Sequence, residues 1–315
     1  MALFSFGLKK AGILGMNSRN LDYIFKENKR VYYANVDDKL LTKKLALEAD
    51  IPVPKLYGVI EYQEQLKHLP ELLEKHKSFV IKPAMGSGGG GIMVIKNRNP
   101  SYFIKPNGKT VSLGDVRYHI SNILAGLYAL GGLRDKAIIE SRVRNADVFK
   151  DLAYQGVPDI RLVIYKGVPA MAMLRLPTHE SDGRANLHSG GIGVGICLAT
   201  GITSHGVLHN TFVEQHSDSA APLTGFQIPD WDNILTMAVK AGEMVNMGYV
   251  GVDIVLDKTK GPMLLEINAR PGISIQIANR AGLKARLDTI IENAPLDGSV
   301  DARIAFAKQA FQVIK

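Results

Sequence analysis

Two apolar runs, VGVDIVLD and GPMLLEIN, flank a short polar turn and predict an antiparallel β-hairpin. Glu266 and Asn268 are two positions apart, so both side chains project from one face of their strand. A turn centred on Thr259 and Lys260 places Asp253 directly opposite Glu266. Three oxygen-bearing side chains therefore meet in one patch of an otherwise apolar sheet, and this is the tightest constraint that the sequence places on the fold.

A patch of carboxylates inside an apolar sheet is costly unless a cation neutralises it. Carboxylate and amide oxygens are hard ligands, which suits Mg²⁺ that carries nucleotide phosphates. Two other interpretations stay open, because the patch can face solvent or can pair with Arg270 or Arg161. A register slip of one residue would also separate the three side chains.

The stretch FVIKPAMGSGGGGIMVIK contains a second candidate site, because five of the six residues 86–91 are glycine. Glycine lets successive backbone NH groups approach one anion without a Cβ clash. The spacing fits neither a P-loop nor a dinucleotide-binding turn, since a strand rather than a helix follows. Lys82 is expected at the end of the first strand, a position from which an ammonium group can reach a phosphate beneath the loop. The alternative is a flexible β-hairpin that binds no ligand.

The formal net charge of +8, from 38 Lys and Arg against 30 Asp and Glu, is compatible with nucleic acid, an anionic ligand or an acidic protein partner, and equally with a charged surface that serves solubility alone. Nucleic acid is not expected, because the chain has no run of five basic residues and no helix-turn-helix or zinc-finger spacing. Cys197 is the only cysteine, which excludes an internal disulfide and agrees with a reducing compartment. No apolar run approaches the roughly 20 residues of a membrane helix. We therefore expect a cytoplasmic protein without a membrane span.

Hydrophobic periodicity predicts an α+β chain of two lobes, with a boundary near residue 135. Helices are expected over residues 39–50, 63–76, 113–130, 231–246 and 301–313. Gly131 and Gly132 are expected to cap the third of these helices. Short strands are expected over residues 55–60, 136–143, 159–167, 169–176, 191–198, 249–257 and 262–268.

Three separated elements resemble the ATP-grasp superfamily of carboxylate-amine ligases. DDKLLTKKLALEADIPVP is similar to the family's entry from a helix into a strand, and Lys39 matches its first nucleotide-binding lysine. FVIKPAMGSGGGGI is similar to its strand and glycine-loop unit, and Lys82 matches the second lysine. VDIV together with LLEINARPG is similar to its pair of metal-binding strands. The resemblance implies three Mg²⁺ ligands, which are Asp253, Glu266 and Asn268.

Further segments resemble the family between these elements. AIIES places Glu140 at the adenine-binding hinge, and PDIR suggests Arg161 as a phosphate ligand. MLRLPTHESDGRANLHSGG is similar to the substrate segment of RimK-like glutamate ligases, so the chain is placed nearest the RimK-related α-L-glutamate ligase-like group. The resemblance implies the catalytic residues Arg161, Arg175 and Arg184, and the nucleotide-binding residues Lys39, Lys82, Gly86, Ser87, Gly88, Gly89, Gly90, Glu140 and Asn186. Asp147 is a candidate for the ribose contact, and His188 joins Arg184 as a candidate for the acidic substrate.

The resemblance implies an ATP-grasp fold, in which two α+β lobes hold the nucleotide between them. We expect residues 1–37 to form a short segment where family members usually carry a complete domain, which corresponds to a truncated N-terminal region. Residues 38–135 form the N-lobe with the glycine loop, and residues 136–315 form the C-lobe with the metal site.

The activity implied is an ATP-dependent ligase that forms an amide through an acylphosphate and attaches an amino acid such as glutamate to a peptide or protein. Its cofactors are ATP and one or two Mg²⁺ ions, which Mn²⁺ can replace. Its partners are an acidic amino acid and a peptide or protein acceptor, and a homo-oligomer is compatible with the sequence. Two alternatives stay open, which are an ATP-grasp phosphotransferase with a hydroxyl acceptor and a nucleotide-binding partner protein without turnover.

Overall fold

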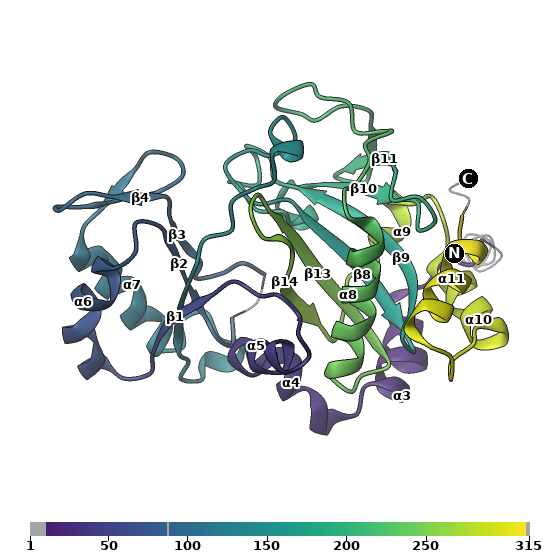
Figure 1. Ribbon diagram of the computed structural model, residues 1–315, viewed down its shortest axis with the longest axis horizontal. Coiled ribbons are helices and arrows are strands. Elements are labelled where there is room, and N and C mark those ends of the chain that lie inside the picture. Colours follow the sequence, from purple (N-terminus) through teal and green to yellow (C-terminus); the bar gives the residue numbers. More distant parts are fainter. Residues whose placement is uncertain (1–10, 87, 313–315) are drawn as a thin grey trace.

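The computed structural model describes residues 11–86 and 88–312 of the chain. The chain folds into a smaller and a larger α+β lobe, and the two lobes lie side by side in Figure 1. Each lobe has its own antiparallel sheet and its own apolar core. None of the helices in the described ranges combines the length and the apolar composition that crossing a membrane requires.

The smaller lobe is built on a four-stranded sheet in the order β1-β7-β2-β3. Its strands are β1 (Leu56–Ile60), β7 (Ala137–Glu140), β2 (Phe79–Pro83) and β3 (Met93–Ile95). Three very short strands form a separate sheet, which comprises β4 (Asn97–Arg98), β5 (Phe103–Ile104) and β6 (Thr110–Val111). The helices of this lobe are α6 (Leu69–Glu74) and α7 (Leu113–Leu124). Alternate residues of β2, Phe79 and Ile81, are fully buried in the core that α7 covers.

The larger lobe is built on a seven-stranded sheet in the order β12-β11-β10-β9-β8-β13-β14. These strands are β8 (Asp159–Tyr165), β9 (Val168–Leu176), β10 (Ile192–Ile196), β11 (Thr203–Leu208), β12 (Thr211–Val213), β13 (Tyr249–Asp257) and β14 (Gly261–Asn268). Helix α8 (Trp231–Met244) lies across β8, β9, β13 and β14 with α11 (Val300–Ala310) beside it, and α9 (Ile275–Ala278) and α10 (Leu283–Asn293) pack against β9 (Figure 1). The central strands are buried along their whole length, which explains why they read as nearly continuous apolar runs.

The segment that precedes Lys39, the first of the two lysines predicted to bind nucleotide, packs on the larger lobe. It contains α2 (Met16–Ser18), a π-helical turn (Arg19–Ile24), α3 (Phe25–Glu27), a 3₁₀ turn (Arg30–Tyr32) and α4 (Ala34–Asp37). Asn28 ties it to the sheet, because its Nδ2 donates to Tyr249 O at 2.7 Å and to Ala269 O at 3.0 Å. Its Oδ1 accepts from Tyr249 N at 3.0 Å. The segment is therefore part of the wall that supports β13.

Helix α5 (Lys39–Glu48) begins as the sequence predicts, because Asp38 caps it by accepting from Leu40 N at 2.8 Å. The helix leads into Ile51, which is buried in the core of the larger lobe together with Ala46 of the helix itself. The packing therefore groups α5 with the larger lobe, whereas the sequence places the whole of 38–135 in the N-lobe. Lys39 and its helix approach the space between the lobes from the side of the larger lobe.

The β13–β14 hairpin confirms the predicted pairing of Asp253 with Glu266. The turn differs from the prediction, because Asp257 pairs with Gly261 and the loop is centred on Thr259 alone. A β-bulge restores the expected register, since Leu264 pairs with Ile254 and leaves one extra residue before Glu266.

Some predicted helix boundaries are wrong. The helix predicted over 113–130 ends at Leu124, where Gly126 takes a positive φ of 83° and stops it before Gly131. The helix predicted over 63–76 divides into a 3₁₀ segment, Gln63–His68, followed by α6. The sequence prediction missed α10 and the outer strands β11 and β12.

Candidate active site

A cavity of about 1120 Å³ opens between the two lobes. Apart from Asp147, the predicted site residues that the structure describes line this cavity. These residues are Arg161, Arg175, Arg184, Lys39, Lys82, Gly86, Gly88, Gly89, Gly90, Glu140, Asn186, Asp253, Glu266 and Asn268. Ser87 lies outside the described residues. Segments far apart in the sequence thus converge on one space, which is large enough for a nucleotide and a second substrate.

Charged residues face one another across four neighbouring strands on the cavity side of the large sheet. Glu266 of β14 pairs with Asp253 of β13, and Asp253 in turn pairs with Arg161 of β8. Asp159 of β8 pairs with Arg175 of β9. The alternation of side chains along each strand brings these five residues to one face.

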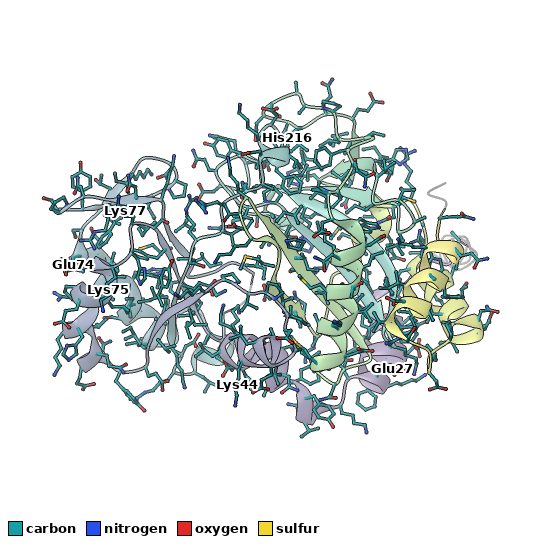
Figure 2. The ribbon with its side chains drawn as sticks, in the orientation of Figure 1. Glu27, Lys44, Glu74, Lys75, Lys77 and His216 are labelled. Carbon is teal, nitrogen blue, oxygen red and sulfur yellow. The ribbon has the colours of Figure 1, made fainter. Side chains whose placement is uncertain are left out.

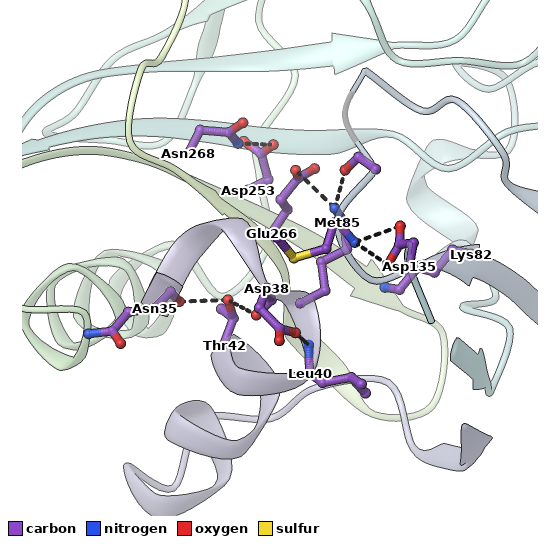
Figure 3. A network of polar contacts seen from close by, with 12 residues as sticks. Asn35, Asp38, Leu40, Thr42, Lys82, Met85, Asp135, Asp253, Glu266 and Asn268 are labelled. Atoms are coloured by element: carbon purple, nitrogen blue, oxygen red, sulfur yellow. Dashed lines mark hydrogen bonds and ion pairs between the residues drawn. The ribbon is translucent and has the colours of Figure 1, made fainter. Parts of the chain in front are cut away.

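Asp253 is 2% exposed and is held by two guanidinium groups. Arg161 donates to both of its oxygens, with Nη2 2.6 Å from Oδ2, and Arg175 Nη2 lies 2.8 Å from the same Oδ2. Asn268 Nδ2 donates to Oδ2 at 3.3 Å (Figure 3). Burial raises the pKa of Asp253, but the two arginines outweigh burial and hold that pKa below its usual range. Of the two arginine pairings that the sequence leaves open, the one with Arg161 is therefore present.

Asp159 is a buried carboxylate that the sequence prediction missed. Arg175 Nε donates to its Oδ1 at 2.5 Å, so Arg175 bridges Asp159 and Asp253. Burial raises the pKa of Asp159 to about 6, against the opposing effect of Arg175. The signal in the sequence is the spacing of Asp159 and Arg161, which are two positions apart on one strand and share a face.

The donor atoms of the patch fit a divalent cation that arrives with phosphates. The Glu266 side chain is 33% exposed and faces the cavity, and its Oε1 lies 3.9 Å from Lys39 Nζ. Asn268 adds an amide oxygen on the same face, whereas Asp253 can contribute only an oxygen that it shares with the arginines. Within the described ranges no three His, Cys, Asp or Glu side chains form a metal cluster. Mg²⁺ suits this donor set, because it takes one or two carboxylates and completes its shell with phosphate and water oxygens.

The two lysines predicted to bind nucleotide enter the cavity from opposite lobes. Lys39 Nζ donates to Gly86 O at the start of the glycine loop. Burial lowers the pKa of Lys39, and the neighbouring Glu266 offsets part of that effect. Lys82 Nζ forms an ion pair with Glu140 Oε1 at 2.6 Å. Both ammonium groups are thus held in place before any phosphate arrives.

Glu140 lies at the end of β7 with both carboxylate oxygens directed at lysines. Lys43 Nζ forms an ion pair with Oε2 at 2.9 Å and also donates a hydrogen bond to Pro54 O. Oε2 receives no hydrogen bond from any described residue. Both oxygens of Glu140 therefore lie against lysine ammonium groups, and its contact with adenine stays a prediction.

The glycine loop forms one wall of the cavity. Gly88, Gly89 and Gly91 have φ values of 62°, 77° and 74°, in the left-handed region that favours glycine. A Cβ on Gly91 would lie 2.6 Å from the ring of Tyr128, so the backbone approaches that ring closely. A Cβ on Gly89 would lie 4.0 Å from Arg184 Cδ of the larger lobe. The tip of the loop therefore spans the gap between the lobes.

The cavity wall has an excess of positive charge that the motifs did not reveal. Several cations line it without forming an ion pair with any carboxylate in the described ranges, namely Lys96, Lys105, Arg142, Arg144 and Arg184. Burial lowers the pKa of Arg142, and the nearby Arg144 lowers it further. Apart from Arg184, which the family resemblance already implies, the sequence shows these residues only as scattered basic positions, and the fold brings them to one wall.

Asp147 requires a correction as the candidate for the ribose contact. It does not line the cavity, its side chain is 75% exposed, and its Oδ1 lies 2.8 Å from Lys258 Nζ. The chain forms a short 3₁₀ turn here (Asp147–Phe149), which buries Phe149 and leaves Asp147 in solvent.

Comparisons with known proteins agree with this geometry. The model of the family described as sugar-transfer associated ATP-grasp matches residues 18–292. A probable alpha-L-glutamate ligase of Thioalkalivibrio sulfidiphilus (strain HL-EbGR7) is 22% identical over 272 residues, which are 85% of this chain and 67% of that protein.

Two solved structures superpose on parts of this chain. D-alanyl-alanine synthetase A from Vibrio cholerae O1 biovar eltor str. N16961 superposes with a TM-score of 0.51 and 12% identity, over 85% of this chain and 67% of that chain. The ATP-grasp ligase PsnB complexed with minimal precursor has a TM-score of 0.46 and 13% identity, over 84% of this chain and 63% of that chain. The chain thus spans about two thirds of the length of the proteins that it matches.

Proposed function

This chain belongs to the sugar-transfer associated ATP-grasp family, and from that premise we propose that it is an ATP-dependent carboxylate-amine ligase. The observation that carries the proposal is the convergence of the described nucleotide, metal and arginine candidates, apart from Asp147, on one cavity between the lobes. In the proposed reaction a carboxylate oxygen attacks the γ-phosphorus of ATP, and the bond to the β-phosphate breaks to release ADP. An amine then attacks the acyl carbon and displaces phosphate, which leaves an amide.

The residues of the chain supply positioning and charge for this reaction. Lys39 and Lys82 reach the cavity from opposite lobes and would hold the α- and β-phosphates. Glu266 and Asn268, with a shared oxygen of Asp253, would hold the metal ion, which neutralises charge between the phosphates when bound.

The arginines and the glycine loop complete the proposed site. Arg161 and Arg175 lie beside the metal candidates and would offset charge on the transferring phosphoryl group. The glycine loop would cover that group and exclude water, which protects a reactive acylphosphate from hydrolysis. Arg184, opposite the tip of the loop, would pair with a substrate carboxylate.

An anionic substrate is supported by the charge of the cavity wall. Arg184 and the other unpaired cations leave positive charge beyond what a metal-bound triphosphate neutralises. The relative named a probable alpha-L-glutamate ligase supports an acidic amino acid such as glutamate. The description of the family adds sugar-linked acids and amines to the candidates. We therefore propose an acidic amino acid as one substrate and a peptide, protein or sugar-linked molecule as the other.

A mass-spectrometric screen tests this function. The purified protein is incubated with Mg²⁺, ATP and pooled amino acids, peptides and amino-sugar acids, with Glu266→Gln as the matched inactive control. A ligase yields a product whose mass equals the two substrates minus water, together with ADP and phosphate. A product heavier by one phosphoryl group identifies a phosphotransferase instead, and nucleotide binding without any product across the screen contradicts an enzymatic function.

A further inference from the structure

Lys43 is a buried cation that none of the motifs assigns. It lies one helical turn after Lys39 on α5, and its Nζ lies 2.9 Å from Glu140 Oε2. The other oxygen of Glu140 pairs with Lys82 Nζ at 2.6 Å. Lys43 and Lys82 are each 7% exposed and Glu140 is 3% exposed, so all three residues are buried away from bulk solvent.

The three residues come from different parts of the fold. Lys43 stands on α5, which packs on the core of the larger lobe. Lys82 stands on β2 of the smaller lobe. Glu140 is the last residue of β7, where the chain leaves the smaller lobe to build the larger one. Lys43, Glu140 and Lys82 together therefore form a polar link between the lobes.

Lys43 is fixed on its own side as well. Its Nζ donates to Pro54 O, in the connection that leads from α5 to β1. Removing one member of a buried ion pair leaves the charge of the other uncompensated. Glu140 therefore holds both lysines in place, and each lysine in turn helps to fix the carboxylate. The carboxylate of Glu140 thus fixes the position of the Lys82 ammonium group, and Lys43 fixes the position of that carboxylate.

The charge balance of the trio shows what Lys43 does for Lys82. With Lys43 present, two ammonium groups share one carboxylate, and a net positive charge stays available for a phosphate. Without Lys43, Glu140 is neutralised by Lys82 alone and competes with the phosphate for that ammonium group. The same change frees Glu140 to shift, which also moves Lys82.

We propose that Lys43 is a positioning residue of the nucleotide site, which acts through Glu140 to hold the ammonium group of Lys82 in the place that phosphate binding needs. The inference rests on the proposed ATP-dependent function and adds a residue to it. Lys43 itself does not need to touch the nucleotide. Its effect on binding therefore passes through Lys82.

A double-mutant cycle tests this inference by calorimetric titration with Mg-ADP. The proteins compared are wild type, Lys43→Met, Lys82→Met and the variant with both changes. We expect Lys43→Met to weaken binding about tenfold, and the double variant to bind no more weakly than Lys82→Met alone. Losses that multiply in the double variant would overturn the inference, because Lys43 would then act independently of Lys82.

Two further variants separate positioning from general damage. Lys43→Arg keeps the charge beside Glu140 and is expected to bind Mg-ADP within about threefold of wild type. Lys44→Met is the matched control, because Lys44 is the next residue on the helix, is 72% exposed and points into solvent (Figure 2). It should bind as wild type does. If Lys43→Met does not fold, Lys43→Gln, which keeps a hydrogen-bond donor, takes its place in the cycle.

The outcomes distinguish this inference from the proposed function. A wild-type protein that binds no Mg-nucleotide contradicts the proposed function itself. A wild-type protein that binds Mg-ADP, with Lys43 variants that bind it equally well, contradicts only the role of Lys43.

Discussion

Asp253 on β13 lies directly opposite Glu266 on β14, and a bulge just before Glu266 aligns the pair. The extra residue is Leu265, which lines the cavity together with Glu266 although the two are consecutive in the chain. A regular strand would send one of them to the opposite face. The bulge thus adds an apolar wall beside the carboxylate without moving the carboxylate away from Asp253.

Glu266 is the carboxylate of the patch that no arginine holds, so it is the principal candidate to hold a metal ion. Glu266→Gln keeps the size of the side chain and removes its charge. We expect at least a 10- to 100-fold loss of Mg²⁺ affinity in the nucleotide complex. The measurement is turnover, followed as ADP release, against Mg²⁺ concentration. Glu292→Gln, an exposed change on α10, should leave that curve unchanged, and the assignment is wrong if Glu266→Gln does so too.

The buried charge of Glu140 predicts how the free energy of unfolding changes with pH. Burial raises its pKa, but Lys82 and Lys43 outweigh burial, so the pKa of Glu140 lies below its ordinary value of 4.5. Such a group contributes stability that is fully present above about pH 4.5 and is lost as the pH falls through its folded-state pKa. Glu140→Gln leaves two buried ammonium groups without a counter-ion, so at pH 7 we expect a loss of about 3–5 kcal/mol in the free energy of unfolding.

Urea unfolding of both proteins at pH 7 and at about pH 3 measures this difference. The gap between wild type and Glu140→Gln should shrink in acid, since protonation of this carboxylate in the unfolded chain below about pH 4.5 removes part of the stability that its charge contributes. Glu74→Gln is the control, because Glu74 lies exposed at the outer edge of the smaller lobe (Figure 2). A gap that stays constant with pH would show that the loss does not come from the charge of Glu140.

A substitution at Gly91 tests the backbone conformation of the glycine loop. Its φ of 74° is unfavourable for any residue with a Cβ, and a Cβ there would lie 2.6 Å from the ring of Tyr128. We expect Gly91→Ala to cost about 1–2 kcal/mol in unfolding free energy and to slow turnover by distorting the loop. Gly15→Ala provides the comparison, because Gly15 has a φ of −82° and open space around it. Equal stability of the two variants would contradict the close approach of the loop to Tyr128.

The ATP-grasp superfamily and its α+β lobes were predictable from the sequence, and both are confirmed. The prediction was possible because the informative residues lie in local units with fixed geometry, such as Lys82 at the end of a strand before a glycine run. The Asp253–Glu266 pairing was also correct, although its predicted turn was not. The bulge before Glu266 compensated the difference in the turn, and a pattern of alternating residues does not reveal a bulge.

The features that the sequence did not predict depend on tertiary packing. Asp159 becomes part of the site because it pairs with Arg175, and Lys43 because it pairs with Glu140. Both partners lie on other elements of the fold, so sequence spacing does not reveal these pairs. The early end of α7 follows from packing against residues 132 and 133, since a Cβ on Gly126 would lie 2.2 Å from Leu133 O. Asp147 failed as a candidate because its exposure is a property of a local turn that sequence spacing does not encode.

The identity of the nucleotide product tests the proposed function most directly. Wild-type protein is incubated with Mg²⁺, ATP and the substrate pool, and the nucleotides are separated by chromatography. A ligase that works through an acylphosphate releases ADP and phosphate in amounts equal to the amide formed, and Glu266→Gln abolishes both. Release of AMP and pyrophosphate with the amide would contradict attack at the γ-phosphate, and with it the roles proposed for Lys39, Lys82 and Arg161.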